Sequence, residues 1–227
     1  LSYRKTLNFH TKPTFTSVNN IIFEELYHPL LTNPVPNSGG IEKNCIITGS
    51  NASGKSTFIK ALAINAILAQ TINTCTARSF SIRKSLIMSS MAVRDSIVDG
   101  ESYFIREIKS LKRILDMIEI TPCMCFIDEI LRGTNTIERI AASASVMEFL
   151  AQKDCLCIVA SHDIELTSLL NNVYDNYHFC ETVTDNGLFF DYTLKNGVSN
   201  TRNAIKLLKH LGFNENIVKK AEQHAAF

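Results

Sequence analysis

The chain has 227 residues, and its 23 basic residues nearly balance its 22 acidic ones. This balance gives no overall field that would draw the chain onto DNA or an anionic membrane, and no apolar run reaches the roughly 18 residues of a membrane span. A hydrophobic content of 45% is enough for a substantial core, and we see no signal peptide. Because the chain begins with Leu1, we expect an excised domain. The lack of an apolar span predicts no direct membrane contact within this chain, and its unpaired thiols predict a cytoplasmic location.

Strands and helices alternate along the chain, which predicts an α/β fold with a mainly parallel sheet flanked by helices. The predicted core strands are 45–48, 123–127 and 155–160, and the predicted helices are 57–71, 102–118, 136–152, 201–211 and 214–225. Residues 178–184 and 188–194 flank Asp185-Asn186-Gly187, which indicates a hairpin and antiparallel strands at the edge of the sheet. The stretch 81–98 has no clear periodicity.

A phosphate loop of the pattern G-x-x-x-x-G-K-[ST] stands between the first core strand and the first helix. It consists of Gly49, Ser50, Asn51, Ala52, Ser53, Gly54, Lys55, Ser56 and Thr57. The backbone N–H groups of such a loop and the N-terminus of the following helix cradle phosphate. Lys55 can reach the β- and γ-phosphates, and the Ser56 hydroxyl can ligate Mg²⁺. The loop predicts that the chain binds a nucleoside triphosphate; an ordinary glycine turn before a helix is the alternative.

Two adjacent carboxylates, Asp128 and Glu129, end the next apolar strand. Acidic residues are common at strand ends, but here they fall at the sheet edge where the phosphates would lie. We expect Asp128 to hold Mg²⁺ through water and Glu129 to orient or deprotonate the water that attacks the γ-phosphate. His162 follows the third core strand and is expected to sense the γ-phosphate, although a surface or capping histidine is the simpler alternative.

Four of the seven cysteines form two pairs, Cys123 with Cys125 and Cys155 with Cys157. Each pair lies within an apolar run that reads as a buried strand, where side chains at i and i+2 face the same surface of the sheet. No histidine or cysteine cluster at a zinc-like spacing accompanies them. We therefore expect small buried core thiols rather than metal ligands, in a reducing compartment.

The motifs together resemble those of the MutS family of ATPases. Residues 127–136 read IDEILRGTNT and residues 158–166 read IVASHDIEL, which are similar to the family's segments around the Mg²⁺-binding Asp and the switch histidine. The phosphate loop is similar with Asn51 retained, and Tyr27-His28-Pro29 resembles the family's entry to the domain. The resemblance implies a P-loop NTPase of the ABC class that uses ATP and Mg²⁺ and forms a head-to-tail homodimer through its ATP sites.

The resemblance also implies a role for Ser102. Residues 100–107 fall where the family has a Gly/Ser-containing loop followed by Phe and Glu. Ser102 would then donate to the γ-phosphate of the partner's site, helped by the positive end of its helix. The sequence alone, apart from this resemblance, predicts Ser102 as the N-cap of the long helix. Both interpretations can hold.

The family further implies a conformational switch for DNA handling, with DNA gripped by regions outside this chain. We expect a strand-rich lead-in at 1–40, an ATPase core at 41–198 and a C-terminal helical pair at 199–227 as a dimerisation candidate. Several positions depart from the family pattern and favour a divergent member; they are Ser50, Ala52, Ser53, Arg78 and Leu131. Residues 30–34 also offer no aromatic side chain to stack on adenine.

Three other functions stay open. An ABC transporter's nucleotide-binding domain would carry a Leu-Ser-Gly-Gly-Gln signature, which residues 99–104 do not supply. An ATP-gated clamp or scaffold with little turnover conflicts with the intact pair Asp128-Glu129. A DNA-binding domain would read a groove with its two C-terminal helices. Those helices carry Lys206, Lys209, Lys219 and Lys220, but a solvated helix face explains these charges more simply.

Overall fold

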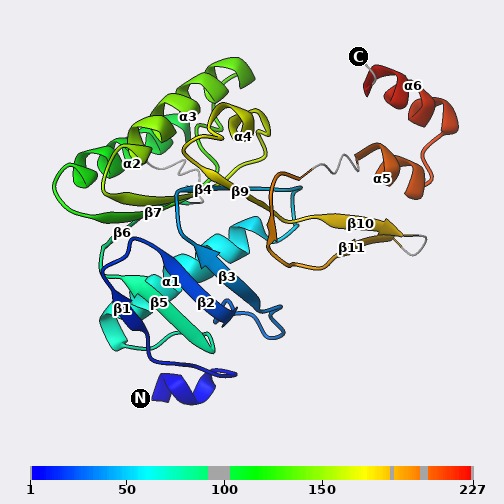
Figure 1. The fold of residues 1–227 in the computed structure, drawn as a ribbon. Coiled ribbons are helices and arrows are strands. Elements are labelled where there is room, and N and C mark those ends of the chain that lie inside the picture. The colour runs from blue at the N-terminus through cyan, green and yellow to red at the C-terminus, as the bar shows by residue number, and fades with distance from the viewer. Residues whose placement is uncertain (1, 92–102, 185–186, 200–203, 226–227) are drawn as a thin grey trace.

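A six-stranded sheet of order β12-β9-β4-β8-β7-β6 forms the centre of the molecule (Figure 1). The computed structural model describes residues 2–91, 103–184, 187–199 and 204–225. The strands of this sheet are β4 (Cys45–Thr48), β6 (Leu86–Ser90), β7 (Cys123–Asp128), β8 (Cys155–Ala160), β9 (Asp175–His178) and β12 (Lys195–Asn196). All pair in parallel except the edge strand β12, which is antiparallel to β9. The predicted mainly parallel sheet is confirmed, but its antiparallel edge is β12 and not the predicted hairpin, which forms a separate two-stranded sheet.

Helices cover both faces of this sheet, which explains why β4, β7 and β8 are almost entirely apolar. The helix α1 lies on one face, and α2, α3 and α4 lie on the other (Figure 1). Their bounds are α1 (Lys55–Ile72), α2 (Tyr103–Ile118), α3 (Thr136–Ala151) and α4 (Glu165–Leu169). No helix in the described ranges is long and apolar enough to cross a membrane.

A second sheet of order β1-β5-β2-β3 packs against the outer side of α1 (Figure 1). Its strands are β1 (Thr14–Thr16), β2 (Ile21–Leu26), β3 (Asn37–Ile41) and β5 (Ser79–Arg83), and a 3₁₀ helix, η1 (Ser2–Thr6), precedes it. The strand β5 follows α1 in the chain but pairs between β1 and β2. The lead-in of the chain and the segment after α1 therefore build one sheet, and α1 is buried between two sheets.

The paired cysteines lie on one face of the central sheet, as predicted. Cys123, Cys125, Cys155 and Cys157 belong to the core cluster packed under α2 and α3, and the Cys155 thiol donates to Cys125 Sγ at 3.3 Å. Burial raises the pKa of the Cys123 thiol to about 11. Within the described residues, no group of three or more His, Cys, Asp or Glu side chains is arranged to hold a metal ion.

The predicted hairpin is present but shorter than expected. It consists of β10 (Glu181–Thr184) and β11 (Gly187–Phe190), with Thr184 opposite Gly187. The prediction placed His178 in its first arm, which is wrong because His178 pairs with Thr48 as the last residue of β9. The chain ends in α5 (Ala204–His210) and α6 (Glu215–Ala225), which stand apart from the central sheet beyond the hairpin (Figure 1).

Candidate functional site

The three predicted motifs meet at one edge of the central sheet. The strands β4, β8 and β7 are neighbours and run parallel, so their carboxyl ends lie side by side. The phosphate loop follows β4, the pair Asp128 and Glu129 ends β7, and His162 follows β8. Ligands of open α/β sheets bind at this edge.

The phosphate loop has a backbone shape that depends on its glycines. Gly49 has φ +140° and Gly54, the residue before α1, has φ +114°. A Cβ on Gly49 would lie 2.4 Å from the carbonyl oxygen of Phe179, so a side chain there would displace backbone. Ala52 is also left-handed, at φ +66°. The loop therefore turns tightly and presents the N-terminus of α1 toward its own interior.

Lys55 is buried inside this loop. Its Nζ donates to the carbonyl oxygens of Gly49 at 2.6 Å and of Ser50 at 2.9 Å, and the residue is only 5% exposed. Burial lowers the pKa of Lys55, while the carboxylates of Glu129, Asp128 and Glu181 oppose that shift. A cation held among several carboxylates can stabilise the negative charge of a phosphate chain.

Ser56, at the start of α1, and Asp128, at the end of β7, lie in contact. The Ser56 hydroxyl donates to Asp128 Oδ1 at 2.9 Å. A hydroxyl and a carboxylate oxygen at this separation form a hard oxygen donor set of the type that Mg²⁺ prefers. The residues present therefore fit Mg²⁺ beside the phosphate loop.

Glu129 is buried at the centre of the site, with 5% exposure and a left-handed backbone at φ +68°. Its Oε1 lies 3.0 Å from a guanidinium nitrogen of Arg132, and its Oε2 contacts Nδ1 of His162. Leu131 is left-handed as well, at φ +56°. A non-glycine residue in this region costs about 1–3 kcal/mol, so the surrounding contacts hold Glu129 in an unusual orientation.

Asp163 joins this arrangement from the segment after β8. It accepts two hydrogen bonds from Arg139 of α3, at 2.9 and 2.6 Å, and both side chains are nearly buried. Asp163 Oδ1 also lies 3.7 Å from Nε2 of His162. His162 thus stands between two carboxylates, Glu129 on one ring nitrogen and Asp163 near the other. The sequence analysis did not identify either Arg139 or Asp163.

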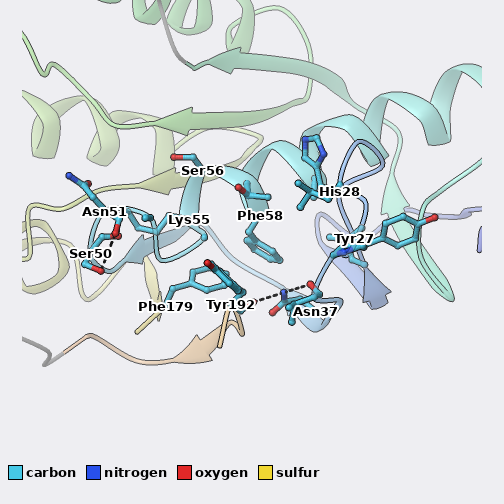
Figure 2. Close-up of a pocket in the computed structure, with 18 of the residues that line it drawn as sticks. Tyr27, His28, Asn37, Ser50, Asn51, Lys55, Ser56, Phe58, Phe179 and Tyr192 are labelled. Atoms are coloured by element: carbon cyan, nitrogen blue, oxygen red, sulfur yellow. Dashed lines mark hydrogen bonds between the residues drawn. The ribbon is translucent and has the colours of Figure 1, made fainter. Parts of the chain in front are cut away.

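A cavity of about 450 Å³ opens directly beside the phosphate loop. Asn51, Lys55 and Thr57 line it on the loop side, and Figure 2 shows Phe58, Phe179 and Tyr192 grouped next to them. Other lining residues are Leu26, Tyr27, His28, Leu31, Asn33, Pro34, Val35 and Asn37. The cavity is large enough for a nucleoside next to the phosphate site.

Tyr192 is a candidate binding residue that the sequence analysis missed. Its carbonyl oxygen accepts from Asn37 Nδ2 at 3.0 Å, and Asn37 Oδ1 accepts from the amide of Leu194 at 2.7 Å. A Cβ on Gly54 would lie 3.3 Å from the Tyr192 ring. The segment after β11 therefore brings an aromatic side chain to the cavity wall, where residues 30–34 offer none. No local signal marks it, because only the fold brings this segment to the loop.

Of the predicted site residues, the phosphate loop, Asp128, Glu129 and His162 lie together. Ser102, predicted to act in a partner's site, lies outside the described residues. The helix α2 that follows Ser102 packs beside the Glu129 segment, since a Cβ on Gly133 would lie 2.6 Å from Phe104 Cβ.

Sequence comparison relates this chain to a known family. Residues 45–227 match MutS domain V. The DNA mismatch repair protein MutS of Aquifex pyrophilus is 30% identical over 223 residues, which cover 93% of this chain and 26% of that protein. The DNA mismatch repair protein MutS of Persephonella marina is 31% identical over 222 residues, covering 93% and 25%. This chain spans about a quarter of the length of these relatives. Because the domain match extends over most of the chain, the chain belongs to the MutS family, within which it corresponds to domain V.

Proposed function

We propose that this chain is the ATP-binding and ATP-hydrolysing domain of a MutS-related protein, a P-loop ATPase of the ABC class. The contact of Ser56 with Asp128 carries the proposal, because it joins the phosphate loop to the carboxylate pair at a distance of 2.9 Å. A loop of this kind without the second motif would support nucleotide binding alone. The two motifs together, with Glu129 buried behind them, support hydrolysis.

In this proposal Lys55 and the loop amides hold the β- and γ-phosphates, and Ser56 and Asp128 hold Mg²⁺. The metal, when bound, offsets the negative charge that the phosphate oxygens develop during transfer. Glu129 accepts a proton from the attacking water or orients it, since its carboxylate is buried and held between Arg132 and His162. His162 contacts Glu129, and its half-exposed side chain would reach the γ-phosphate from there.

The base and ribose would occupy the cavity beside the loop. His28, Tyr192 and Phe58 give that cavity flat, partly apolar walls on which a purine can stack. Burial, with a smaller effect of Lys60, lowers the pKa of His28. A neutral imidazole is the form expected against a purine ring at neutral pH.

At the level of the whole protein, we propose a head-to-tail homodimer around two Mg-ATP molecules that switches conformation for DNA handling. Its relatives are named DNA mismatch repair proteins, and a DNA repair role carries over as part of this proposal. DNA would be held by regions outside this chain. The proposed units are a lead-in at 1–40, the ATPase core at 41–198 and the helical pair at 199–227.

A second candidate is an ATP-gated clamp or scaffold that binds ATP with little turnover. The left-handed backbone of Glu129 and its contacts with Arg132 and His162 are the observations that bear on it. If these contacts hold Glu129 away from the attacking water, the chain would bind ATP and release phosphate very slowly. An assay of ATP binding together with phosphate release distinguishes the two functions.

The test compares nucleotide binding and phosphate release in the wild-type chain and three variants. Lys55→Ala should abolish binding of a fluorescent ATP analogue. Lys112→Ala removes an exposed lysine that does not line the cavity and should leave binding unchanged. Glu129→Gln should bind Mg-ATP normally but turn over slower by a factor on the order of 10² to 10⁴. An unchanged turnover in Glu129→Gln would remove Glu129 from the mechanism, and wild-type binding without measurable turnover would favour the clamp.

A further inference from the structure

A buried carboxylate from the hairpin contacts the phosphate loop, and neither sequence motif includes it. Glu181 is the first residue of β10 and is 6% exposed. Its Oε2 accepts a hydrogen bond from the Ser50 hydroxyl at 2.6 Å. Ser50 is also one of the positions that depart from the family pattern. A carboxylate bonded to a phosphate loop calls for an explanation, because it places negative charge beside the proposed site of a polyphosphate.

Ser50 is held from two directions. Its hydroxyl is bonded to Glu181, and its carbonyl oxygen accepts from Lys55 Nζ at 2.9 Å. Ser50 thus connects Glu181 to Lys55: the carboxylate fixes its side chain, and its carbonyl oxygen holds the ammonium group. Glu181 therefore stabilises the conformation in which Lys55 is bonded to the carbonyl oxygens of its own loop.

The segment that carries Glu181 runs alongside the phosphate loop and contacts it at several points. The amide of Phe179 donates to Thr48 O at 3.0 Å, and the Phe179 carbonyl oxygen lies against Gly49. Beyond Glu181, which pairs with Phe190 in the hairpin, the chain returns to the loop at Tyr192. At the other end of the hairpin, a Cβ on Gly187 would lie 3.5 Å from His210 Nε2 of α5. The hairpin thus contacts the phosphate loop at its base and the C-terminal helices near its tip.

We propose that Glu181 is a positioning residue that holds the phosphate loop through Ser50, lowers the affinity of the site for polyphosphate, and couples nucleotide binding to the β10–β11 hairpin. This inference rests on the proposed nucleotide site. Two effects act in the same direction. The carboxylate repels the incoming phosphates, and it favours the position of Lys55 on the loop carbonyls, from which Lys55 must move to bind phosphate.

The decisive variant is Glu181→Gln, which removes the charge but keeps an oxygen that can accept from Ser50. We expect it to bind the Mg-ATP analogue more tightly than wild type, by a factor on the order of 10. A merely structural role of Glu181 would give the opposite result, because a disordered loop binds phosphate less well. Ser50→Ala is the matched control: it breaks the contact with the loop but keeps the carboxylate, so it should gain less affinity than Glu181→Gln.

The coupling to the hairpin is tested on the wild-type chain by hydrogen exchange. Adding Mg-ATP should change the exchange rates of the amides of β10 and β11, and Glu181→Gln should reduce that change. The inference is overturned if Glu181→Gln binds Mg-ATP within about twofold of wild type or more weakly, or if exchange in the wild-type hairpin does not respond to nucleotide. Failure of the proposed function looks different, since wild type and Lys55→Ala would then bind the analogue equally.

Discussion

At the scale of single residues, loss of one partner from the buried pair of Arg139 and Asp163 is expected to destabilise the fold. Arg139 donates twice to Asp163, and the two side chains are 12% and 6% exposed. Arg139→Met would leave the carboxylate of Asp163 buried without its charge partner. We expect the free energy of unfolding to fall by about 3 kcal/mol, measured by urea denaturation.

The matched control is the pair of Arg83 and Asp154, joined at 2.6 Å with Asp154 56% exposed. Asp154→Asn should change the free energy of unfolding by no more than about 1 kcal/mol, because solvent screens this pair. Equal losses of unfolding free energy in the two variants would mean that burial does not make the Arg139–Asp163 pair more important for stability than an exposed pair.

Some residues of the site could be predicted from the sequence, and others could not. Lys55 ends the loop that follows β4, Asp128 and Glu129 lie at the end of β7, and His162 lies just after β8. Parallel strands bring such positions to one edge. Tyr192, Glu181 and Arg139 follow no such rule. Their contacts with the loop or with Asp163 depend on the path of the hairpin and on the position of α3, which no local pattern determines.

At the scale of elements, the start of α2 is fitted closely against the segment after Glu129. A Cβ added to Gly133 would lie 2.6 Å from Phe104 Cβ, a distance at which one backbone must move. Glu107, one turn further along α2, is 2% exposed, and its burial raises the pKa of its carboxyl group. Hydrogen bonds from the backbone amides of Arg132, Leu131 and Gly133 act in the opposite direction and connect α2 to the Glu129 segment. The helix and the Glu129 segment are therefore packed tightly against each other.

Gly133→Ala should lower the free energy of unfolding by about 1–3 kcal/mol through overpacking and should reduce ATP turnover, measured by phosphate release. Gly40→Ala is the control, because its Cβ would meet no atom closer than 3.7 Å. Normal stability and turnover in Gly133→Ala would show that α2 can shift without disturbing Glu129.

The elements themselves were predictable where their patterns are strong. The strands β4, β7 and β8 are continuous apolar runs, and the stripe of α2 has a clear helical period. The stretch 81–98 gave no prediction, yet it contains β6 and most of β5, two short strands with partly exposed residues. These segments form strands because they pair with β1, β2 and β7, and their own sequence periodicity does not reveal this.

At the scale of the whole molecule, the proposed dimer predicts a change of mass on nucleotide binding. Light scattering of Glu129→Gln should give a monomer without nucleotide and a dimer with Mg-ATP, because the variant holds ATP without hydrolysing it. A monomer in both conditions, with ATP bound, would contradict a site shared between two copies of this chain. A dimer in both would point to a standing interface, for which α5 and α6 are the first candidates.

The order of the central sheet also has a consequence for synthesis. The strand β8 lies between β4 and β7 in the sheet, although it follows both in the chain. A nascent chain that stops before Cys155 already contains the phosphate loop and both carboxylates, but it lacks the strand that sets them side by side. Such non-local pairing forms slowly, and apolar strands that wait for a partner are prone to aggregate. During translation, β4 and β7 should therefore depend on protection by chaperones until β8 emerges from the ribosome.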